Sequence, residues 1–212
     1  MYITLMRHGA VQTPNLFAAS KHEPLSTLGW QQMLESSNKN QKAYGKWTQL
    51  ISSPALRCAD FAQTLHQKTK TPLNIEATCQ EMNFGDWLDQ PRQTIWETHQ
   101  AQLQQLWQEP LAFVAPNGES MLQFQKRIQV FWQKLIAQHH HKHNKQQIAN
   151  NHLLIITHAG VIRLLISVLL EIPHKKSLSI QLNHACYLTW KLYDDHAISL
   201  LELFNPPNNS AK

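Results

Sequence analysis

The sequence has few of the features that mark membrane, secreted or fibrous proteins. It holds three cysteines and six glycines in 212 residues, and 16% of its residues are charged. Cys58, Cys79 and Cys186 are odd in number and form no C-x-x-C pair, which argues against a disulfide framework or a zinc knuckle. No apolar run is long enough to span a bilayer, and no basic segment precedes the first apolar run. These absences predict a globular cytoplasmic protein with no membrane partner.

The charge of the chain is moderately positive and evenly spread. Lysine and arginine number 19 against 14 acidic residues, which gives a net charge of +5 with histidine neutral. The basic residues do not gather into a run, so nucleic acid is not the expected partner. A modest positive field favours a small anionic partner, such as a phosphorylated metabolite. Hydrophobic residues make up 42% of the chain, enough to build a core without a disulfide or a metal.

Short apolar runs alternate with stretches in which apolar residues recur at helical spacing. The runs, typical of buried strands, cover residues 2–6, 50–52, 73–75 and 153–157. Helices are predicted at about 27–41 with Ser26 as the N-cap, from Ser53-Pro54 onward, at about 92–108, through 124–135 and after His158. Residues 185–203 alternate as two further strands do.

This alternation predicts an α/β fold, a three-layer α/β/α sandwich with a mostly parallel central sheet. No internal repeat or linker divides the chain. Residues 1–212 are therefore expected to form a single domain, with loops and a helix around 80–118 as a small cap. Ligands of such sheets bind at the carboxyl ends of the strands, and the functional side chains are expected there.

Two of the predicted strands end in the same way, with a histidine and then a glycine within two residues. These ends are Arg7-His8-Gly9 and His158-Ala159-Gly160. If the strands are neighbours, the two histidines meet at one edge of the sheet, and Arg7 and Arg57 bring two guanidinium groups there. Without an anion, the repulsion between the two guanidinium groups makes such a cluster unfavourable in free energy. A phosphoryl dianion fits, because arginine binds phosphate oxygens through paired hydrogen bonds and helix N-termini add N–H donors.

The cluster also predicts a mechanism. Surrounding cations favour the neutral form of His8, so its ring can attack phosphorus and form a phosphohistidine. Arg7, Arg57 and His158 would hold the developing charge. A carboxylic acid must protonate the departing oxygen, and Glu81 is the candidate, although a loop carboxylate bound to the backbone or to an arginine is the alternative. No metal and no cofactor is needed.

Five motifs together resemble one family. They are Leu5-Met6-Arg7-His8-Gly9, Ser52-Ser53-Pro54-x-x-Arg57, Glu81-Met82-x-Phe84-Gly85-Asp86, Asn117-Gly118-Glu119-Ser120 and Thr157-His158-x-Gly160-Val161-Ile162-Arg163. In this order they resemble the histidine phosphatase superfamily of phosphoglycerate-mutase-like proteins, over residues 2 to about 190. The resemblance implies the phosphoglycerate-mutase-like fold and His8 as nucleophile. It also implies Glu81 as proton donor and a phosphate pocket built from Arg7, Arg57, His158, Gly9 and Ala159.

Within the superfamily, the short chain and the pairing of the Glu81 motif with Glu119-Ser120 resemble α-ribazole-5′-phosphate phosphatases, since mutases usually carry additional segments. This implies α-ribazole 5′-phosphate or adenosylcobalamin 5′-phosphate as substrate, in cobalamin nucleotide-loop assembly. The chain departs from the pattern at Ala10-Val11, Leu88-Asp89 and Ala159. Two alternatives therefore stay open: a broad-specificity phosphatase of small metabolites or sugar phosphates, and a non-catalytic protein that binds a phosphorylated ligand.

The remaining candidates have weaker signals. Trp87 follows Glu81 closely and is expected at the substrate pocket, where it would stack on an aromatic ligand. The resemblance places Asn183 near the same pocket, whereas Arg163 is expected to be structural. The tract 139–143 is read as a solvated linker, because consecutive positions on a helix do not converge on one metal ion. The oligomeric state stays open, with a homodimer as one alternative.

Overall fold

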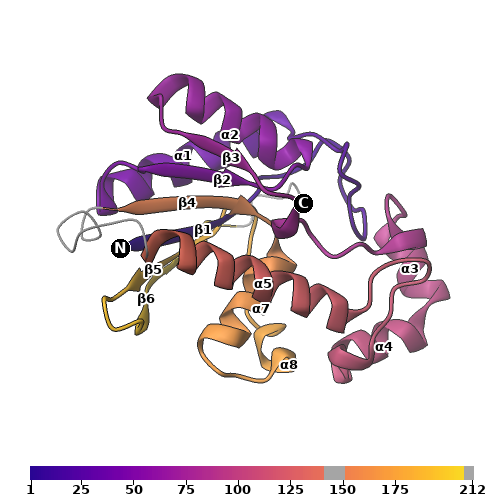
Figure 1. Ribbon diagram of the computed structural model, residues 1–212. Coiled ribbons are helices and arrows are strands. Elements are labelled where there is room, and N and C mark those ends of the chain that lie inside the picture. The colour runs from indigo at the N-terminus through magenta and orange to yellow at the C-terminus, as the bar shows by residue number, and fades with distance from the viewer. Residues whose placement is uncertain (141–150, 208–212) are drawn as a thin grey trace.

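Six strands form one mixed sheet at the centre of the protein. The computed structural model describes residues 1–140 and 151–207, without the side chains of residues 139 and 140. The strand order is β3-β2-β4-β1-β5-β6 (Figure 1). The strands are β1 (Tyr2–Arg7), β2 (Gln49–Ser52), β3 (Leu73–Ile75), β4 (His152–Thr157), β5 (Tyr187–Leu192) and β6 (Ile198–Phe204). β1 to β4 pair in parallel, whereas β5 pairs antiparallel with both β1 and β6, so β5 alone is reversed among the described strands; this confirms the predicted mostly parallel sheet.

Helices cover both faces of this sheet (Figure 1). Helices α1 (Thr27–Tyr44) and α2 (Leu56–Thr69) lie on one face, and α5 (Met121–His140) and α7 (Ala159–Leu169) lie on the other. Side chains along β4 alternate between the two layers, as strand geometry requires. Leu154 and Ile156 belong to the apolar cluster under α1 and α2, whereas Leu153 and Ile155 belong to the cluster under α5 and α7. The three-layer prediction is confirmed.

The two helices on the first face begin differently. Helix α1 has the predicted cap, because the Ser26 hydroxyl accepts a hydrogen bond from the Gly29 amide at 3.0 Å. The predicted start of α2 at Ser53-Pro54 is wrong, since the helix begins at Leu56 and its N-cap, Ala55, makes no side-chain bond. The reason is that the Ser53 hydroxyl contacts the ring of His158 at 2.8 Å. Ser53 therefore belongs to the site described below.

The predicted helix over 92–108 is two helices, α3 (Arg92–Thr98) and α4 (Gln100–Gln108). His99 breaks it with φ −128° and ψ 35°, and its ring packs edge-on against Trp87 at 5.3 Å between centroids. Both helices stand beyond the carboxyl end of the sheet (Figure 1). The shorter elements are α8 (His174–Ser177) and the 3-10 helices η1 (Ala77–Cys79), η2 (Gly85–Trp87) and η3 (Pro110–Ala112). The single domain with a cap around 80–118 remains a prediction.

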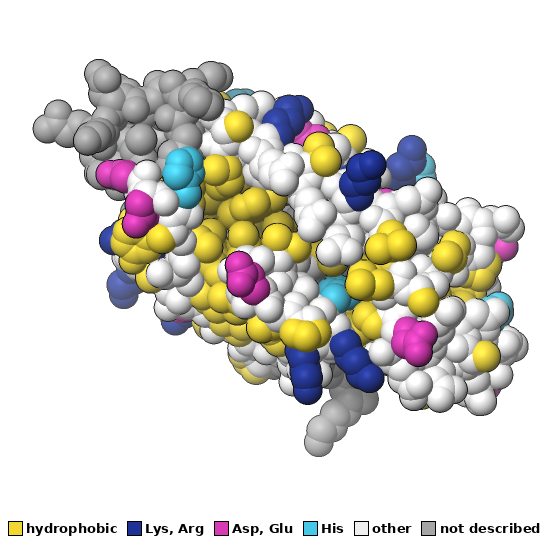
Figure 2. Space-filling view, turned by 60° about the horizontal axis from the view of Figure 1, so that its bottom comes forward, with side chains coloured by type: hydrophobic (Ala, Val, Ile, Leu, Met, Phe, Trp, Pro, Cys, Tyr) yellow, Lys and Arg dark blue, Asp and Glu magenta, His cyan; other side chains and the backbone are white. Residues whose placement is uncertain are grey.

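The outer surface carries mixed side chains. Figure 2 shows one face, on which the described lysines and arginines form separate spots rather than a continuous stripe. Cys58, Cys79 and Cys186 are buried and free. Within residues 1–140 and 151–207, no helix combines the length and the hydropathy that crossing a bilayer requires.

Candidate active site

The two histidines predicted to meet do so at the carboxyl edge of the sheet. β1 and β4 are parallel neighbours with Arg7 opposite Thr157, so each histidine follows its strand at the same level. The His8 amide donates to the Thr157 carbonyl at 3.0 Å. The two imidazole rings lie edge to face, with centroids 5.3 Å apart. The topology of two adjacent parallel strands is sufficient to produce this juxtaposition.

His8 is held in one tautomer by its neighbour. Its Nδ1 lies 2.8 Å from the Gly9 carbonyl oxygen, which can only accept, so Nδ1 carries the proton and Nε2 carries the lone pair. The ring is 8% exposed. Burial, followed by the positive charges of Arg57 and Arg7, holds the pKa of His8 well below its usual range. His8 is therefore a neutral imidazole with a nucleophilic nitrogen.

His158 is fixed on both sides of its ring. Arg57 Nη2 donates to Nδ1 at 3.3 Å, which leaves the proton on Nε2, and Nε2 donates to the Ser53 hydroxyl at 2.8 Å. Burial, then Arg57 and Arg7, lowers the pKa of His158 well below its usual range. Ser53 was absent from the predicted site, although the Ser52-Ser53-Pro54 motif contains it.

Two arginines approach the histidines, as predicted. Arg57 is 3% exposed, and it donates to the carbonyls of Ser20 and Ala19 at 2.6 and 3.2 Å. Arg7 donates to the Leu182 carbonyl at 2.5 Å, and burial lowers its pKa to about 10. Among the described residues, neither Nε atom has a hydrogen-bond partner, and neither guanidinium forms an ion pair. These two cations together match the charge of a phosphoryl dianion.

Glu81 reaches the same place from the loop after η1. Its Oε2 accepts from the Gly160 amide at 3.1 Å, two residues beyond His158, and its Oε1 accepts from the Met82 amide at 3.1 Å. A Cβ on Gly160 would lie only 2.2 Å from Oε1. Gly160 therefore leaves the space that the carboxylate occupies. The structure places the Glu81 carboxylate at the start of α7, two residues beyond His158.

Gly9 and Ala159 follow His8 and His158 directly, and both pack closely against neighbouring parts of the fold. A Cβ on Gly9 would lie 2.2 Å from the Gly29 carbonyl oxygen, so this glycine permits the start of α1 to pack against the strand end. Ala159 is the first residue of α7, and its methyl group packs against the apolar core. Arg163 donates to the Ile180 carbonyl at 3.3 Å.

The side chain of Asn183 does not lie at the expected pocket, whereas that of the next residue, His184, lies beside His8. The Asn183 side chain donates to the Pro206 carbonyl at 2.7 Å and accepts from Gln181, so it faces the C-terminal segment instead of the pocket. His184 lies against His8 with ring centroids 5.8 Å apart. Burial, then Arg7 and Arg92, lowers the pKa of His184 to about 3. No motif surrounds His184, so the sequence carried no signal for it.

The expected position of Trp87 in the pocket is wrong. Its side chain is 1% exposed and belongs to the apolar core, with Phe17, His99 and Phe113 around the ring. Two neighbouring aromatic residues, Phe17 and Phe84, are partly exposed, and their rings meet edge-on with centroids 5.4 Å apart. Residues 16–18 also pair with residues 88–91 through two isolated bridges. Packing of the paired segments 16–18 and 88–91 against the core, rather than contact with a ligand, explains the burial of Trp87.

Within the part of the chain that the structure describes, no group of three or more His, Cys, Asp and Glu residues is arranged to hold a metal ion. The histidine tract from 139 to 143 lies outside these residues apart from the backbone of its first two positions. Its interpretation as a linker stays a prediction.

Comparison with known proteins identifies the family. The sequence model of the histidine phosphatase superfamily (branch 1) matches residues 3–206. This chain belongs to the histidine phosphatase superfamily. The adenosylcobalamin/alpha-ribazole phosphatase of Escherichia coli (strain K12) is a curated relative in this superfamily, 24% identical over 191 residues that cover 88% of each chain.

One further relative and one solved structure of similar fold are named for other reactions. The 2,3-bisphosphoglycerate-dependent phosphoglycerate mutase of Bartonella quintana (strain Toulouse) is 24% identical over 210 residues, 96% of this chain and 98% of the mutase. Additional segments therefore do not separate this mutase from the chain. The mycobacterial glucosyl-3-phosphoglycerate phosphatase, solved with inorganic phosphate, has 21% identity and a TM-score of 0.76 over 99% of this chain and 98% of its own. Its likeness confirms the fold.

Proposed function

We propose that this protein is a phosphomonoesterase that works without a metal ion and passes through a phosphohistidine on His8. The observation that carries the proposal is the hydrogen bond from His8 Nδ1 to the Gly9 carbonyl at 2.8 Å. It leaves the lone pair on Nε2, and burial, followed by the charges of Arg57 and Arg7, lowers the pKa of His8 and keeps the ring neutral. A neutral imidazole with a fixed tautomer is an activated nucleophile for phosphorus.

The reaction proceeds in two balanced steps. His8 Nε2 forms a bond to phosphorus while the ester P–O bond breaks, and the departing oxygen takes the proton of the Glu81 carboxyl. Water then attacks the phosphohistidine and gives its proton to the Glu81 carboxylate, and the N–P bond breaks to release phosphate. Arg7 and Arg57, with the backbone at Gly9 and Ala159, stabilise the charge on the phosphoryl oxygens in both steps. His158 joins them when its Nε2–H turns from the Ser53 hydroxyl to a phosphoryl oxygen.

The proposed substrate is α-ribazole 5′-phosphate or adenosylcobalamin 5′-phosphate, in cobalamin nucleotide-loop assembly. The support is the Escherichia coli relative, which matches 88% of this chain. The sugar-phosphate alternative is supported by the mycobacterial relative. We place the reaction in the cytoplasm, a compartment in which Cys58, Cys79 and Cys186 remain reduced.

One assay tests the substrate. We expect kcat/KM for α-ribazole 5′-phosphate to exceed that for p-nitrophenyl phosphate and for 3-phosphoglycerate by about two orders of magnitude or more, with EDTA present, because remote contacts of the true leaving group contribute to transition-state binding. Similar values for all three would contradict the cobalamin assignment but support a broad phosphatase. No hydrolysis of any would favour a protein that only binds phosphorylated ligands.

The His8→Ala variant tests the nucleophile. The variant should retain its fold, because the ring lies at the carboxyl edge of the sheet and outside the apolar core, and should lose turnover of every substrate. Far-ultraviolet circular dichroism checks the fold. A folded His8→Ala variant with unchanged kcat would exclude His8 as the nucleophile.

A further inference from the structure

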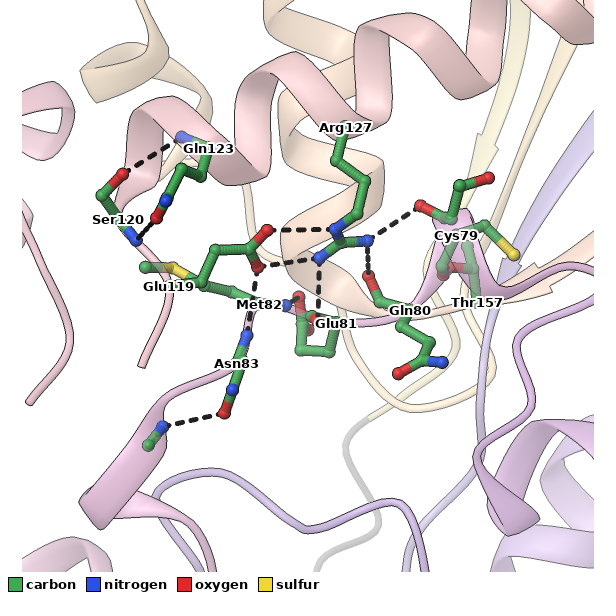
Figure 3. A network of polar contacts seen from close by, with 12 residues as sticks. Cys79, Gln80, Glu81, Met82, Asn83, Glu119, Ser120, Gln123, Arg127 and Thr157 are labelled. Carbon is green, nitrogen blue, oxygen red and sulfur yellow. Dashed lines mark hydrogen bonds and ion pairs between the residues drawn. The ribbon is translucent and has the colours of Figure 1, made fainter. Parts of the chain in front are cut away.

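The motif Asn117-Gly118-Glu119-Ser120 takes no part in the proposed reaction, yet it is tightly built into the structure. It leads into α5 through a capping box, in which Ser120 and Gln123 exchange hydrogen bonds between side chain and backbone at 2.9 and 3.2 Å. The Glu119 amide donates to the Asn83 carbonyl at 2.8 Å. The beginning of α5 is thus joined to the loop that carries Glu81 (Figure 3).

That loop has a run of backbone carbonyls that no neighbouring strand satisfies. Residues 78–81 form no part of the sheet, and their four carbonyl oxygens bond to two side chains. The Thr157 hydroxyl donates to Cys79 at 2.7 Å. Arg127 on α5 donates to Thr78 at 2.8 Å, to Gln80 at 3.0 Å and to Glu81 at 3.2 Å. The backbone on the N-terminal side of the Glu81 carboxyl is therefore held mainly by Arg127.

All five N–H groups of Arg127 are used. Three bond to the carbonyls, and the other two pair with Glu119, from Nε to Oε1 at 3.0 Å and from Nη2 to Oε2 at 2.8 Å. Glu119 Oε2 also accepts from the Asn83 amide at 3.2 Å, so the pair holds the loop on both sides of Glu81 (Figure 3). The two side chains are 24% and 15% exposed. A planar fork with five donors meets these acceptors, whereas the three donors of lysine share one nitrogen.

We propose that Arg127, oriented by Glu119, is a positioning residue that holds the Glu81 carboxyl at the Gly160 amide, in reach of the departing oxygen. This inference rests on the proposed function, because it assumes that Glu81 is the general acid. Arg127 touches the backbone of residues 78–81 and not the phosphoryl site. Its loss moves the acid while leaving His8, Arg7 and Arg57 in place.

The test compares two phosphate esters of similar size. Benzyl phosphate has an alkoxide leaving group that needs a proton, whereas p-nitrophenolate departs without one. In Arg127→Ala we expect kcat/KM for benzyl phosphate, which reports the step in which the leaving group departs, to fall about 100-fold, the lower end of a general-acid contribution. The kcat/KM for p-nitrophenyl phosphate should fall less than about threefold. Free guanidinium ion should restore part of the lost rate. The matched control is Lys126→Ala, which removes an exposed positive charge from the adjacent position on α5 and should leave both rates unchanged.

Glu81→Gln separates this proposal from the proposed function. If Glu81→Gln lowers kcat/KM equally for the two substrates, Glu81 is not the acid, and the positioning role falls with the assigned mechanism. Suppose instead that Glu81→Gln lowers kcat/KM for benzyl phosphate alone. If Arg127→Ala then lowers kcat/KM equally for both substrates, or for neither, the mechanism stands and the positioning role is refuted.

A second variant covers the case in which Arg127→Ala does not fold. Arg127→Lys keeps the charge and most of the apolar contact with Phe124, whose ring lies 5.0 Å from the guanidinium carbon. It should show the same selective loss for benzyl phosphate, smaller in size. Wild-type rates in a folded Arg127→Lys would contradict the need for the five-donor fork.

Discussion

The substitution Gly160→Ala tests the place of the general acid with a single methyl group. Gly160 is the second residue of α7, and its amide donates to Glu81 Oε2 at 3.1 Å. The added Cβ would lie 2.2 Å from Oε1, 3.0 Å from Cδ and 3.3 Å from Oε2. Since non-bonded carbon atoms need roughly 3.5 Å, the carboxyl must move by about 1 Å or rotate away.

The cost in stability should be small. The clashing group is the end of a flexible side chain, and alanine is favoured over glycine in a helix by about 1 kcal/mol, which offsets the loss of one hydrogen bond of about 1 kcal/mol. The free energy of unfolding in urea should therefore change by less than about 1 kcal/mol. The kcat/KM for benzyl phosphate should fall by about 100-fold or more, and that for p-nitrophenyl phosphate should change little, because kcat/KM reports the leaving-group step and not the later hydrolysis.

Gly45→Ala is the control variant, in which an added methyl group changes stability and not the reaction rates. Gly45 ends α1 with φ +83°, and a Cβ there would meet nothing within 4 Å. The strained backbone should cost about 1 kcal/mol of stability while both rates stay the same. A Gly160→Ala variant that hydrolyses benzyl phosphate at the wild-type rate would refute the role of Glu81 at this amide.

Three further predictions concern the stability of the fold. Trp87→Ala should lower the free energy of unfolding in urea by about 3–5 kcal/mol because the ring fills the core; a change in KM alone would show that Trp87 is a ligand contact. Gly9→Ala should cost about 1–3 kcal/mol or more in the same assay, since its Cβ would meet the Gly29 backbone; wild-type stability would contradict this packing. Burial lowers the pKa of His152 to about 4, so the unfolded state binds the extra proton. The stability from His152 is complete above about pH 6.5 and falls by up to about 1.4 kcal/mol per pH unit towards pH 4. In His152→Gln the pH dependence should be shallower, and an unchanged slope would exclude this contribution.

The central part of the site was predictable because strand geometry determines it. An apolar run that stops at a histidine places that histidine at the end of a buried strand, and two such strands in parallel bring His8 and His158 together. Arg57 follows from helical spacing, since it lies four residues before Phe61 and eight before Leu65, on the buried side of α2. The apolar positions of α5, such as Phe124 and Ile128, are buried for the same periodic reason.

Contacts that depend on loops were not predictable. The Arg127 fork joins residues 46 to 49 positions apart in the sequence, and nothing in the spacing of the motifs indicates it. Asn183 faced the C-terminal segment, and its neighbour His184 faced the site, because a single residue of loop register decides which side chain points inward. The nearness of Trp87 to Glu81 in sequence predicts a position in the pocket, whereas the short η2 turn directs the ring into the core.

The most direct test of the account is to trap the phosphoryl group on the protein. The enzyme is mixed with a phosphate ester labelled on phosphorus, quenched with base, and digested for mass spectrometry. The account predicts an acid-labile, base-stable label on His8 that is absent from the His8→Ala variant and accumulates during turnover. A turning-over enzyme with no label on His8, or with the label on His158 or His184, would contradict the proposed nucleophile.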